Sequence, residues 1–257
     1  MTENKQFEIR LNEPGILKDA LSVTGSFFSE ATFKVTKEHI YLCGMDPANV
    51  SLVELELLSS SASVWNINQD EYSFSVNIEN INNIFKNLKK DDILKIWPDE
   101  NNLILNFIGE SDRDYKVPFI ELDIKEQKVP ELNHKATVNL ESKRFYNQIK
   151  EAGTVSESVL FKVTGPDAPF ILSAVSDLNQ LNIKNKPGAD INIKIAPGDA
   201  AICKYSIEYL KKIADAKKVS DTVKLSFSND YPLIAEYYVL DKLRLKFILA
   251  PRVSNDE

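Results

Sequence analysis

Apolar side chains recur at the three- and four-residue spacing of an amphipathic helix in four stretches of the chain. In one of them, Ile81, Phe85 and Leu88 fall on a single face. The four stretches are 13–28, 77–90, 141–152 and 206–218. The side chains placed to cap three of these helices are Asn12, Ser142 and Ser206. We therefore predict four helices, each with one face buried against the rest of the fold.

Most of the remaining chain has the pattern of short β-strands. These runs are rich in β-branched and aromatic residues and are bounded by turn residues. They include 33–36, 51–58, 93–96, 103–107, 223–227 and 243–249. Many short strands with a few helices laid on one face of the sheets are typical of the α+β class.

The chain also contains an internal repeat. Phe33–Thr36 reads Phe-Lys-Val-Thr and recurs as Phe161–Thr164, an offset of 128 positions. Ile78 and Glu79 recur 129 positions later as Ile207 and Glu208, and Asp92 has its counterpart in Asp221 at the same offset. Several matches in one order favour two similar domains. We expect a first domain over 1–117, a connecting segment over 118–134 and a second domain over 135–257.

Composition places the chain among ordinary globular proteins. It has 257 residues, of which 43% are hydrophobic and 27% charged. No run approaches the ~18 consecutive apolar residues of a membrane span, and the polar N-terminus gives no sign of a signal peptide. Cys43 and Cys203 stand far apart without a CxxC pattern, which favours two reduced thiols and an intracellular location.

The positive charges are concentrated in the predicted helices. The whole chain carries a formal charge of −7, yet the four helical stretches together carry +4 and the rest −11. Two interpretations stand: four solvated helix faces, or one surface that meets phosphate. Aromatic residues are not interleaved with these cations, which favours duplex DNA over a single strand. The candidate DNA-binding residues are Lys18, Lys86, Lys89, Lys90, Lys143, Arg144, Lys150, Lys211, Lys212, Lys217 and Lys218.

Motifs for catalysis or cofactor binding are missing from the sequence. The eight glycines form neither a P-loop nor a dinucleotide fingerprint, and there is no GxSxG or HExxH. His39 and His134 lack neighbours with metal-ligand spacing. Asp112 and Asp114 could ligate a cation, although a solvated loop is the favoured interpretation. We predict no catalytic residue, no metal and no cofactor.

Four segments carry a specific family signature. They are Met45–Val53 (Met-Asp-Pro-Ala-Asn-Val-Ser-Leu-Val), Ile120–Asp123 followed by Val129–Glu131, Tyr231–Tyr237 with its Pro-Leu-x-x-Glu-Tyr pattern, and Leu249–Val253 (Leu-Ala-Pro-Arg-Val). In this order and spacing they resemble the signatures of the PCNA-type DNA sliding clamps, and the resemblance covers nearly the whole chain.

This resemblance implies a fold and a function. It implies two clamp-fold domains per chain, with antiparallel sheets outside and two helices each on the inner face. Such chains assemble into a trimeric ring with pseudo-six-fold symmetry that encircles duplex DNA without sequence specificity. The ring is a non-enzymatic processivity factor that tethers polymerase and other replication or repair proteins. Family position places the subunit edges near Asp112–Pro118 and around Phe170–Leu181.

The resemblance also implies a docking pocket for short partner peptides with hydrophobic and aromatic anchors. The matching positions are Met45, Asn49, Val50, Gln127, Val129, Pro130, Pro232, Ile248, Ala250 and Pro251. Plain core packing is the alternative for Met45 and Ile248. Three positions depart from the family pattern. This chain has Ile248 where the family usually has an aromatic residue, Gln127 where it has an apolar one, and Glu208 where it more often has a basic one.

Partners and location follow from the same resemblance. The expected partners are other clamp subunits, in a homotrimer or heterotrimer, a clamp loader, and a DNA polymerase, flap nuclease and ligase; no membrane partner is expected. The short tail after Val253 is more similar to archaeal members, which favours a cytoplasmic protein over a nuclear one. Two alternatives are a checkpoint-type clamp subunit and an interaction scaffold of the same fold that is never loaded on DNA.

Overall fold

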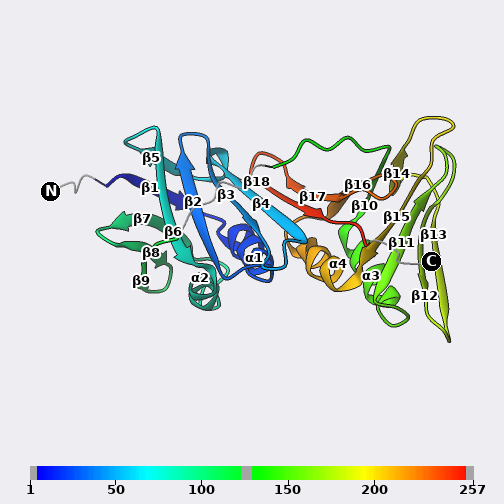
Figure 1. The fold of residues 1–257 in the computed structure, drawn as a ribbon. Coiled ribbons are helices and arrows are strands. Elements are labelled where there is room, and N and C mark those ends of the chain that lie inside the picture. Colours follow the sequence, from blue (N-terminus) through cyan, green and yellow to red (C-terminus); the bar gives the residue numbers. More distant parts are fainter. Residues whose placement is uncertain (1–4, 123–128, 253–257) are drawn as a thin grey trace. The chain divides into compact units, whose positions relative to one another are not determined.

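One order of secondary-structure elements occurs twice along the chain (Figure 1). The computed structural model describes residues 5–122 and 129–252. The first run is β1 (Phe7–Leu11), α1 (Gly15–Thr24), β2 (Glu30–Thr36), β3 (His39–Met45), β4 (Ser51–Leu58), the 3₁₀ turn Ser59–Ser61, β5 (Val64–Ile67), β6 (Glu71–Asn77), α2 (Ile78–Phe85), β7 (Ile93–Asp99), β8 (Asn102–Ile108) and β9 (Asp112–Pro118). The second is β10 (Ala136–Glu141), α3 (Ser142–Ala152), β11 (Ser158–Val163), β12 (Phe170–Val175), β13 (Gln180–Asn185), β14 (Ile191–Lys194), β15 (Ala201–Ser206), α4 (Ile207–Ala214), the 3₁₀ helix η2 (Asp215–Lys218), β16 (Thr222–Phe227), β17 (Leu233–Val239) and β18 (Leu243–Leu249).

The strand pairing repeats as well. β1 pairs with β5 and β7, and its counterpart β10 pairs with β14 and β16. β2 pairs with β3 and β6, and β11 pairs with β12 and β15. The first Phe-Lys-Val-Thr ends β2; in the second, Phe161–Val163 ends β11 and Thr164 follows it. This confirms the α+β fold with two similar halves that the sequence predicted.

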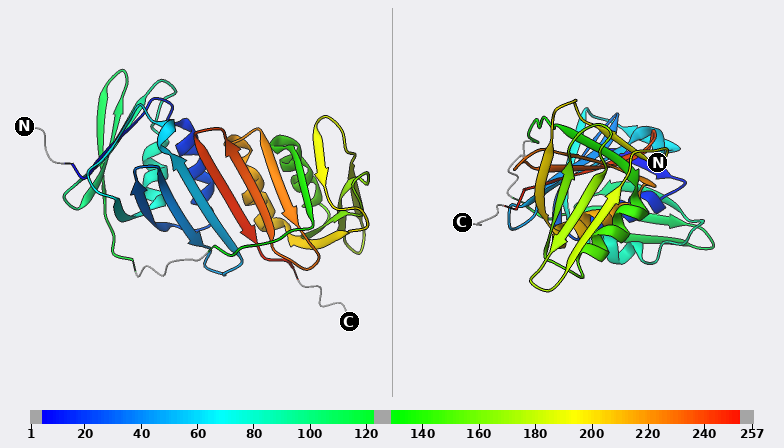
Figure 2. Two further views of the ribbon diagram at one scale, coloured as in Figure 1. Left: turned by 90° about the horizontal axis from the view of Figure 1, so that it is seen from above. Right: turned by 90° about the vertical axis from the view of Figure 1, so that its right-hand side faces the viewer.

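The chain divides into two compact units. The described residues of the N-terminal unit are 5–47, 53–122 and 239–245, and those of the C-terminal unit are 48–52, 129–238 and 246–252. The N-terminal unit contains a sheet of order β5-β1-β7-β8-β9 and the strands β4-β3-β2-β6. The C-terminal unit contains β14-β10-β16-β17 with the second half of β18, whose first half (243–245) belongs to the N-terminal unit, and a sheet of order β13-β12-β11-β15. Figure 2 shows the strands of each unit with the helices against them.

Each unit buries its helices against its sheets through apolar and aromatic side chains. In the N-terminal unit, the ring of Phe85 on α2 lies 6.0 Å from that of Phe107 on β8. In the C-terminal unit, Phe145 on α3 lies 6.3 Å from Phe161 on β11, and Phe161 lies 5.3 Å from Tyr205 on β15. Burial of each such side chain contributes about 1.5–3 kcal/mol. The predicted amphipathic periodicity therefore identified the faces that form the cores.

The two helices of each unit approach each other at a glycine. Gly25 ends α1, and a Cβ atom there would lie 2.5 Å from Nδ2 of Asn82 on α2. Asn82 uses this nitrogen to donate to the carbonyl of Leu21, at 3.1 Å. Gly153 ends α3 in the same way, and a Cβ atom there would lie 2.6 Å from Nζ of Lys211 on α4. A side chain at either position would therefore have to displace the second helix's side chain.

The helix ends differ from the sequence prediction. The prediction that Asn12 caps α1 is wrong, because its Oδ1 accepts from the hydroxyl of Ser63 and Pro14 occupies the N-cap. Ser142 lies inside α3, and the Ser206 side chain makes no capping hydrogen bond to α4. α2 is capped instead by Asn77, whose Oδ1 accepts from the amide of Asn80 at 2.9 Å. A short polar side chain can bond to partners near or far in the sequence, as Asn12 does with Ser63, so a capping pattern alone does not select one.

Candidate functional site

The predicted DNA-binding residues lie on or directly after the four helices. Lys18 is on α1; Lys143, Arg144 and Lys150 are on α3; Lys211 and Lys212 are on α4; and Lys217 and Lys218 are in η2. Lys86 is the C-cap of α2, and Lys89 and Lys90 follow it. The predicted helix 77–90 thus extends too far, since α2 ends at Phe85 and Asp92 accepts a hydrogen bond from the amide of Lys89.

Most of these cations are accessible to solvent. Lys18, Lys212 and Lys217 are half-buried, and the other eight are exposed. α3 and α4 contact each other and lie side by side in Figure 2; they carry five of the eleven cations, and η2, which directly follows α4, carries two more. The cations of α1 and the α2 end are fewer and belong to the N-terminal unit. Within each unit, the basic residues are therefore carried by neighbouring helices.

Six of the cations already have a protein contact. Lys89 pairs with Glu110, Lys212 with Glu208 at 3.9 Å, and Lys218 with Asp215 at 3.5 Å. Lys86 donates to Asn83 and Lys18 to the carbonyl of Leu88, while Lys217 lies over the ring of Tyr146. The hydrogen bond from Lys89 lowers the pKa of the Glu110 carboxyl below its ordinary value. Ion pairs between exposed side chains, such as that of Lys89 with Glu110, are weak and can exchange for phosphate.

The remaining five cations are uncompensated. Across residues 5–122 and 129–252, no hydrogen bond or ion pair engages the side chains of Lys90, Lys143, Arg144, Lys150 or Lys211. Three of them lie on α3. An exposed cation without a carboxylate partner attracts phosphate without first breaking a protein contact. α3 is accordingly the helix best suited to meet a polyanion.

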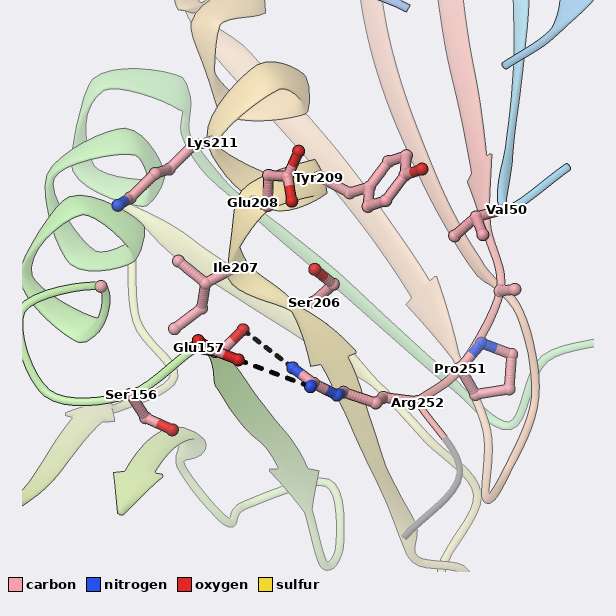
Figure 3. Close-up of a pocket in the computed structure, with 12 residues that line it drawn as sticks. Val50, Ser156, Glu157, Ser206, Ile207, Glu208, Tyr209, Lys211, Pro251 and Arg252 are labelled. Atoms are coloured by element: carbon pink, nitrogen blue, oxygen red, sulfur yellow. Dashed lines mark hydrogen bonds and ion pairs between the residues drawn. The ribbon is translucent and has the colours of Figure 1, made fainter. Parts of the chain in front are cut away.

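Three of the predicted peptide-binding residues line one pocket of the C-terminal unit. This pocket has a volume of about 680 Å³ and is lined by Val50, Ala250 and Pro251. Val50 and Pro251 lie on one side of it (Figure 3). The amide of Ala250 donates to the carbonyl of Val50 at 2.9 Å, which joins the chain end to a segment two hundred residues earlier. The opposite side is formed by Ser206 and the first turn of α4.

The other predicted pocket residues lie elsewhere. Met45 is half-buried at the end of β3 in the N-terminal unit. Asn49 is exposed in a turn with φ 56°, a left-handed conformation that Asn tolerates. Val129, Pro130 and Pro232 are outside the pocket lining, and the Pro232 carbonyl lies 2.8 Å from Nε2 of His134. Ile248 is only 7% exposed, as core packing would require. Gln127 lies outside the described residues.

The pocket also contains residues that the sequence did not assign to it. Arg252 donates to the carbonyl of Glu157 at 3.4 Å and pairs with its carboxylate at 3.6 Å, which closes one end of the pocket (Figure 3). Glu208 lines it as well, and so does Lys211, which was predicted to contact DNA. A segment between Gly153 and Glu157 completes the wall. These residues are distant in sequence and match no shared motif, so only the fold brings them together.

The residues considered for other chemistry lie in the described part of the chain. Within it, no group of three His, Cys, Asp or Glu side chains is arranged to hold a metal ion. Asp114 accepts from Nδ2 of Asn106 at 2.8 Å, and Asp112 is exposed on β9. Cys43 and Cys203 are free thiols. None of the helices that the structure describes is long and apolar enough to span a membrane.

Comparisons with known proteins agree across nearly the whole chain. The family model "Proliferating cell nuclear antigen, N-terminal domain" matches residues 6–131, and "Proliferating cell nuclear antigen, C-terminal domain" matches 128–252. A DNA polymerase sliding clamp of Nanoarchaeum equitans is 32% identical, over 92% of this chain and 95% of the relative. One from Pyrococcus furiosus is 30% identical, over 96% of this chain and 99% of the relative.

A solved structure has the same fold. The crystal structure of proliferating cellular nuclear antigen from Entamoeba histolytica superposes with a TM-score of 0.89. The match covers 97% of this chain and 100% of that one, at 19% sequence identity. At this identity the likeness concerns the fold.

Proposed function

The chain belongs to the proliferating cell nuclear antigen family of DNA sliding clamps, and we propose that it forms a ring of three clamp subunits whose helices face duplex DNA. It is a DNA sliding clamp processivity factor; the curated relatives are named DNA polymerase sliding clamps. The proposal that the helices face DNA rests on one observation. Exposed cations without a protein partner are gathered on or directly after the helices, although the chain has a formal charge of −7. The working domain division is 1–117, 118–134 and 135–257.

DNA binding in this proposal is electrostatic. Lysine and arginine side chains neutralise phosphates without reading base edges, so the contact is non-specific and weakens with salt. The negative charge outside the helices discourages DNA from wrapping around the exterior. The clamp then slides because no contact depends on sequence. It holds its partners at the DNA and catalyses no reaction.

Ring closure requires unpaired strand edges. β9 and β13 each end a sheet, and each pairs with only one neighbour in the described chain. The sequence expectation of an edge around Phe170–Leu181 needs correction, because Phe170–Val175 is β12 and pairs on both sides. We propose that β9 of one subunit pairs with β13 of the next, head to tail. Identical subunits and related but distinct ones both satisfy this geometry.

Partner docking is assigned to the pocket beside Ala250 and Pro251. Val50, Ala250 and Pro251 supply an apolar wall, and the adjoining chain offers backbone groups to an incoming peptide. The proposed partners are a DNA polymerase, flap nuclease, ligase and clamp loader, with Met45, Asn49, Gln127, Val129, Pro130, Pro232 and Ile248 kept as candidate contacts. A cytoplasmic location is proposed from the archaeal relatives.

The first test is the mass of the purified chain, measured by light scattering during size exclusion. Three times 29.1 kDa supports a ring of identical subunits. A monomer at every concentration contradicts it and leaves a ring that requires distinct subunits.

The second test addresses the DNA surface. In the triple variant Lys143→Gln, Arg144→Gln, Lys150→Gln, the slope of log affinity against log salt for a linear duplex should fall by about 0.9 for each phosphate that the variant no longer neutralises. Fluorescence anisotropy at several salt concentrations measures this slope. Lys37→Gln, which removes an exposed cation that pairs with Asp70 and lies between strands β2 and β3, is the control. An unchanged slope in the triple variant contradicts a DNA-facing α3.

A further inference from the structure

The outward face of the sheet β13-β12-β11-β15 is basic and aliphatic. The four strands contain Lys162, Lys184 and Lys204 and not one Asp or Glu. The whole chain, by contrast, has 38 acidic and 31 basic residues. A sheet without acidic residues in an acidic protein is a local feature that the helix surface does not account for.

The strand register places these lysines on one face. Lys162 lies opposite Ile202 on one side and Ile171 on the other, and Ile171 lies opposite Lys184. Leu160 lies opposite Lys204. Residues directly opposite in an antiparallel pair point to the same side of the sheet. The opposite side carries Phe161, which packs against Phe145 of α3, so the lysine side faces away from the helices.

Aliphatic side chains on this face are solvent-exposed. Ile202 is 37% exposed and Val175 is 59% exposed, and Leu160 is half-buried between them. A pocket of about 500 Å³ is hollowed into the face between these residues and the loop at Asn229 and Asp230. Arg252 lines both this pocket and the one beside Pro251. The two pockets therefore adjoin at a single side chain.

The lysines on this face are also unpaired. Among the residues that the structure describes, none accepts a hydrogen bond from, or forms an ion pair with, the ammonium groups of Lys162, Lys184 and Lys204. Along β11, Leu160 and Lys162 stand two residues apart, about 6.6 Å in an extended strand. An extended ligand with an aliphatic and an acidic side chain two positions apart reproduces this spacing.

We propose that this face binds an extended segment of a partner protein, in which aliphatic and acidic side chains alternate along one side of the segment. We call this face the β11 face and define it by Leu160, Lys162, Val175, Ile202 and Lys204. The aliphatic side chains fill the pocket beside Val175 and Ile202, and the carboxylates pair with Lys162 and Lys204. DNA fits less well, because phosphates leave the aliphatic surface uncovered and Asp230 borders the pocket.

The test uses a synthetic seven-residue peptide in which Ile, Asp, Val and Glu alternate with Thr. It is titrated into full-length protein with labelled methyl groups and observed by NMR. Methyl signals of Leu160, Val175 and Ile202 should shift. In the double variant Lys162→Glu, Lys204→Glu the affinity should fall about tenfold, since two attractive pairs become repulsive. A peptide with Lys in place of Asp and Glu should not bind.

The repeat supplies a matched control. Lys34 occupies the position of Lys162 in the other copy of Phe-Lys-Val-Thr, and Lys34→Glu should leave peptide affinity unchanged. Absence of methyl shifts, an equal loss in Lys34→Glu, or stronger perturbation of the same methyls by a DNA duplex would each overturn the proposal. The light-scattering mass and the salt slope for DNA do not depend on the β11 face, so they test the clamp function separately.

Discussion

The two repeats have equivalent four-stranded arrangements with different outward faces. In the N-terminal unit, the order β4-β3-β2-β6 matches β13-β12-β11-β15 of the C-terminal unit. Its polar groups pair with one another: Thr32 with Ser75 at 2.7 Å, Tyr41 with Glu54 at 3.0 Å, and Glu56 with Arg244 at 3.1 Å. The corresponding face of the C-terminal unit presents aliphatic side chains and unpaired lysines.

The difference shows which positions determine this fold. Both copies keep a phenylalanine at the first position of Phe-Lys-Val-Thr, and both phenylalanines are buried. The following lysine points away from the core in each, so its surroundings can diverge with little effect on stability. Equivalent folding therefore leaves the two outward faces open to different uses.

The largest expected effect is on the shared buried face. Phe33→Ala and Phe161→Ala should each lower the free energy of unfolding by about 3–5 kcal/mol, because a large side chain leaves a cavity. Chemical denaturation followed by circular dichroism measures both. A loss below about 1 kcal/mol in only one variant would show that the two cores are not equivalent.

The second largest effect is a difference in stability between substitutions at two equivalent positions of the repeat, Asp92 and Asp221. Asp92 is 1% exposed and pairs with Arg113, whereas Asp221 is exposed. Asp92→Asn should lower the free energy of unfolding by about 2 kcal/mol through the loss of charged hydrogen bonds. Asp221→Asn should stay within about 0.5 kcal/mol of the parent. Equal effects in denaturant titrations would contradict this asymmetry.

The ion pair of Asp92 with Arg113 makes the free energy of unfolding depend on pH. Burial raises the pKa of Asp92, but the amide of Lys89 and the guanidinium of Arg113 outweigh it, so the pKa lies below its ordinary value. The carboxylate therefore stabilises the folded state above the unfolded pKa of about 3.9, and this stabilisation is lost as pH falls through the lower folded pKa. Unfolding of the parent and of Asp92→Asn should converge in acid; a constant difference down to pH 2 refutes the assignment.

A smaller effect tests the polar pairing of the N-terminal face. Thr32→Val removes the hydrogen bond to Ser75, which is itself buried, and should destabilise the protein by about 1 kcal/mol. Leu160→Val, at the equivalent position of β11, changes the side chain on a half-exposed face and should have a smaller effect. Denaturation midpoints compare the two; a larger loss for Leu160→Val would reverse the comparison.

The smallest effect is expected at the repeated lysine. Lys162→Glu should change the free energy of unfolding by less than about 0.5 kcal/mol, because its ammonium group has no partner among the described residues. Lys34 does have an interaction, so Lys34→Glu should be the more destabilising of the two. Parallel thermal unfolding measures the difference, and a larger loss at Lys162 would reveal a structural role for the β11 face.

Much of the candidate site could be predicted because it lies in contiguous segments. The residues at Ala250 and Pro251 and those of α3 were identified from motifs and periodicity that need only a few neighbouring positions. The prediction extended α2 to residue 90, however, because Leu88 continued the apolar pattern while the chain had already turned. The capping prediction failed at Asn12 because Ser63, fifty-one positions away, takes its oxygen.

The sequence by itself determined the helix positions, the duplication and the family, because periodic burial and short signatures are local properties. Only the tertiary structure decided that Val50 meets Ala250, that Lys211 borders the same pocket, and that Lys162 shares a face with Ile202 and Ile171. Strand register and pocket walls join residues far apart in the chain. Their partners are selected by packing and hydrogen bonding of the whole fold, which no local pattern encodes.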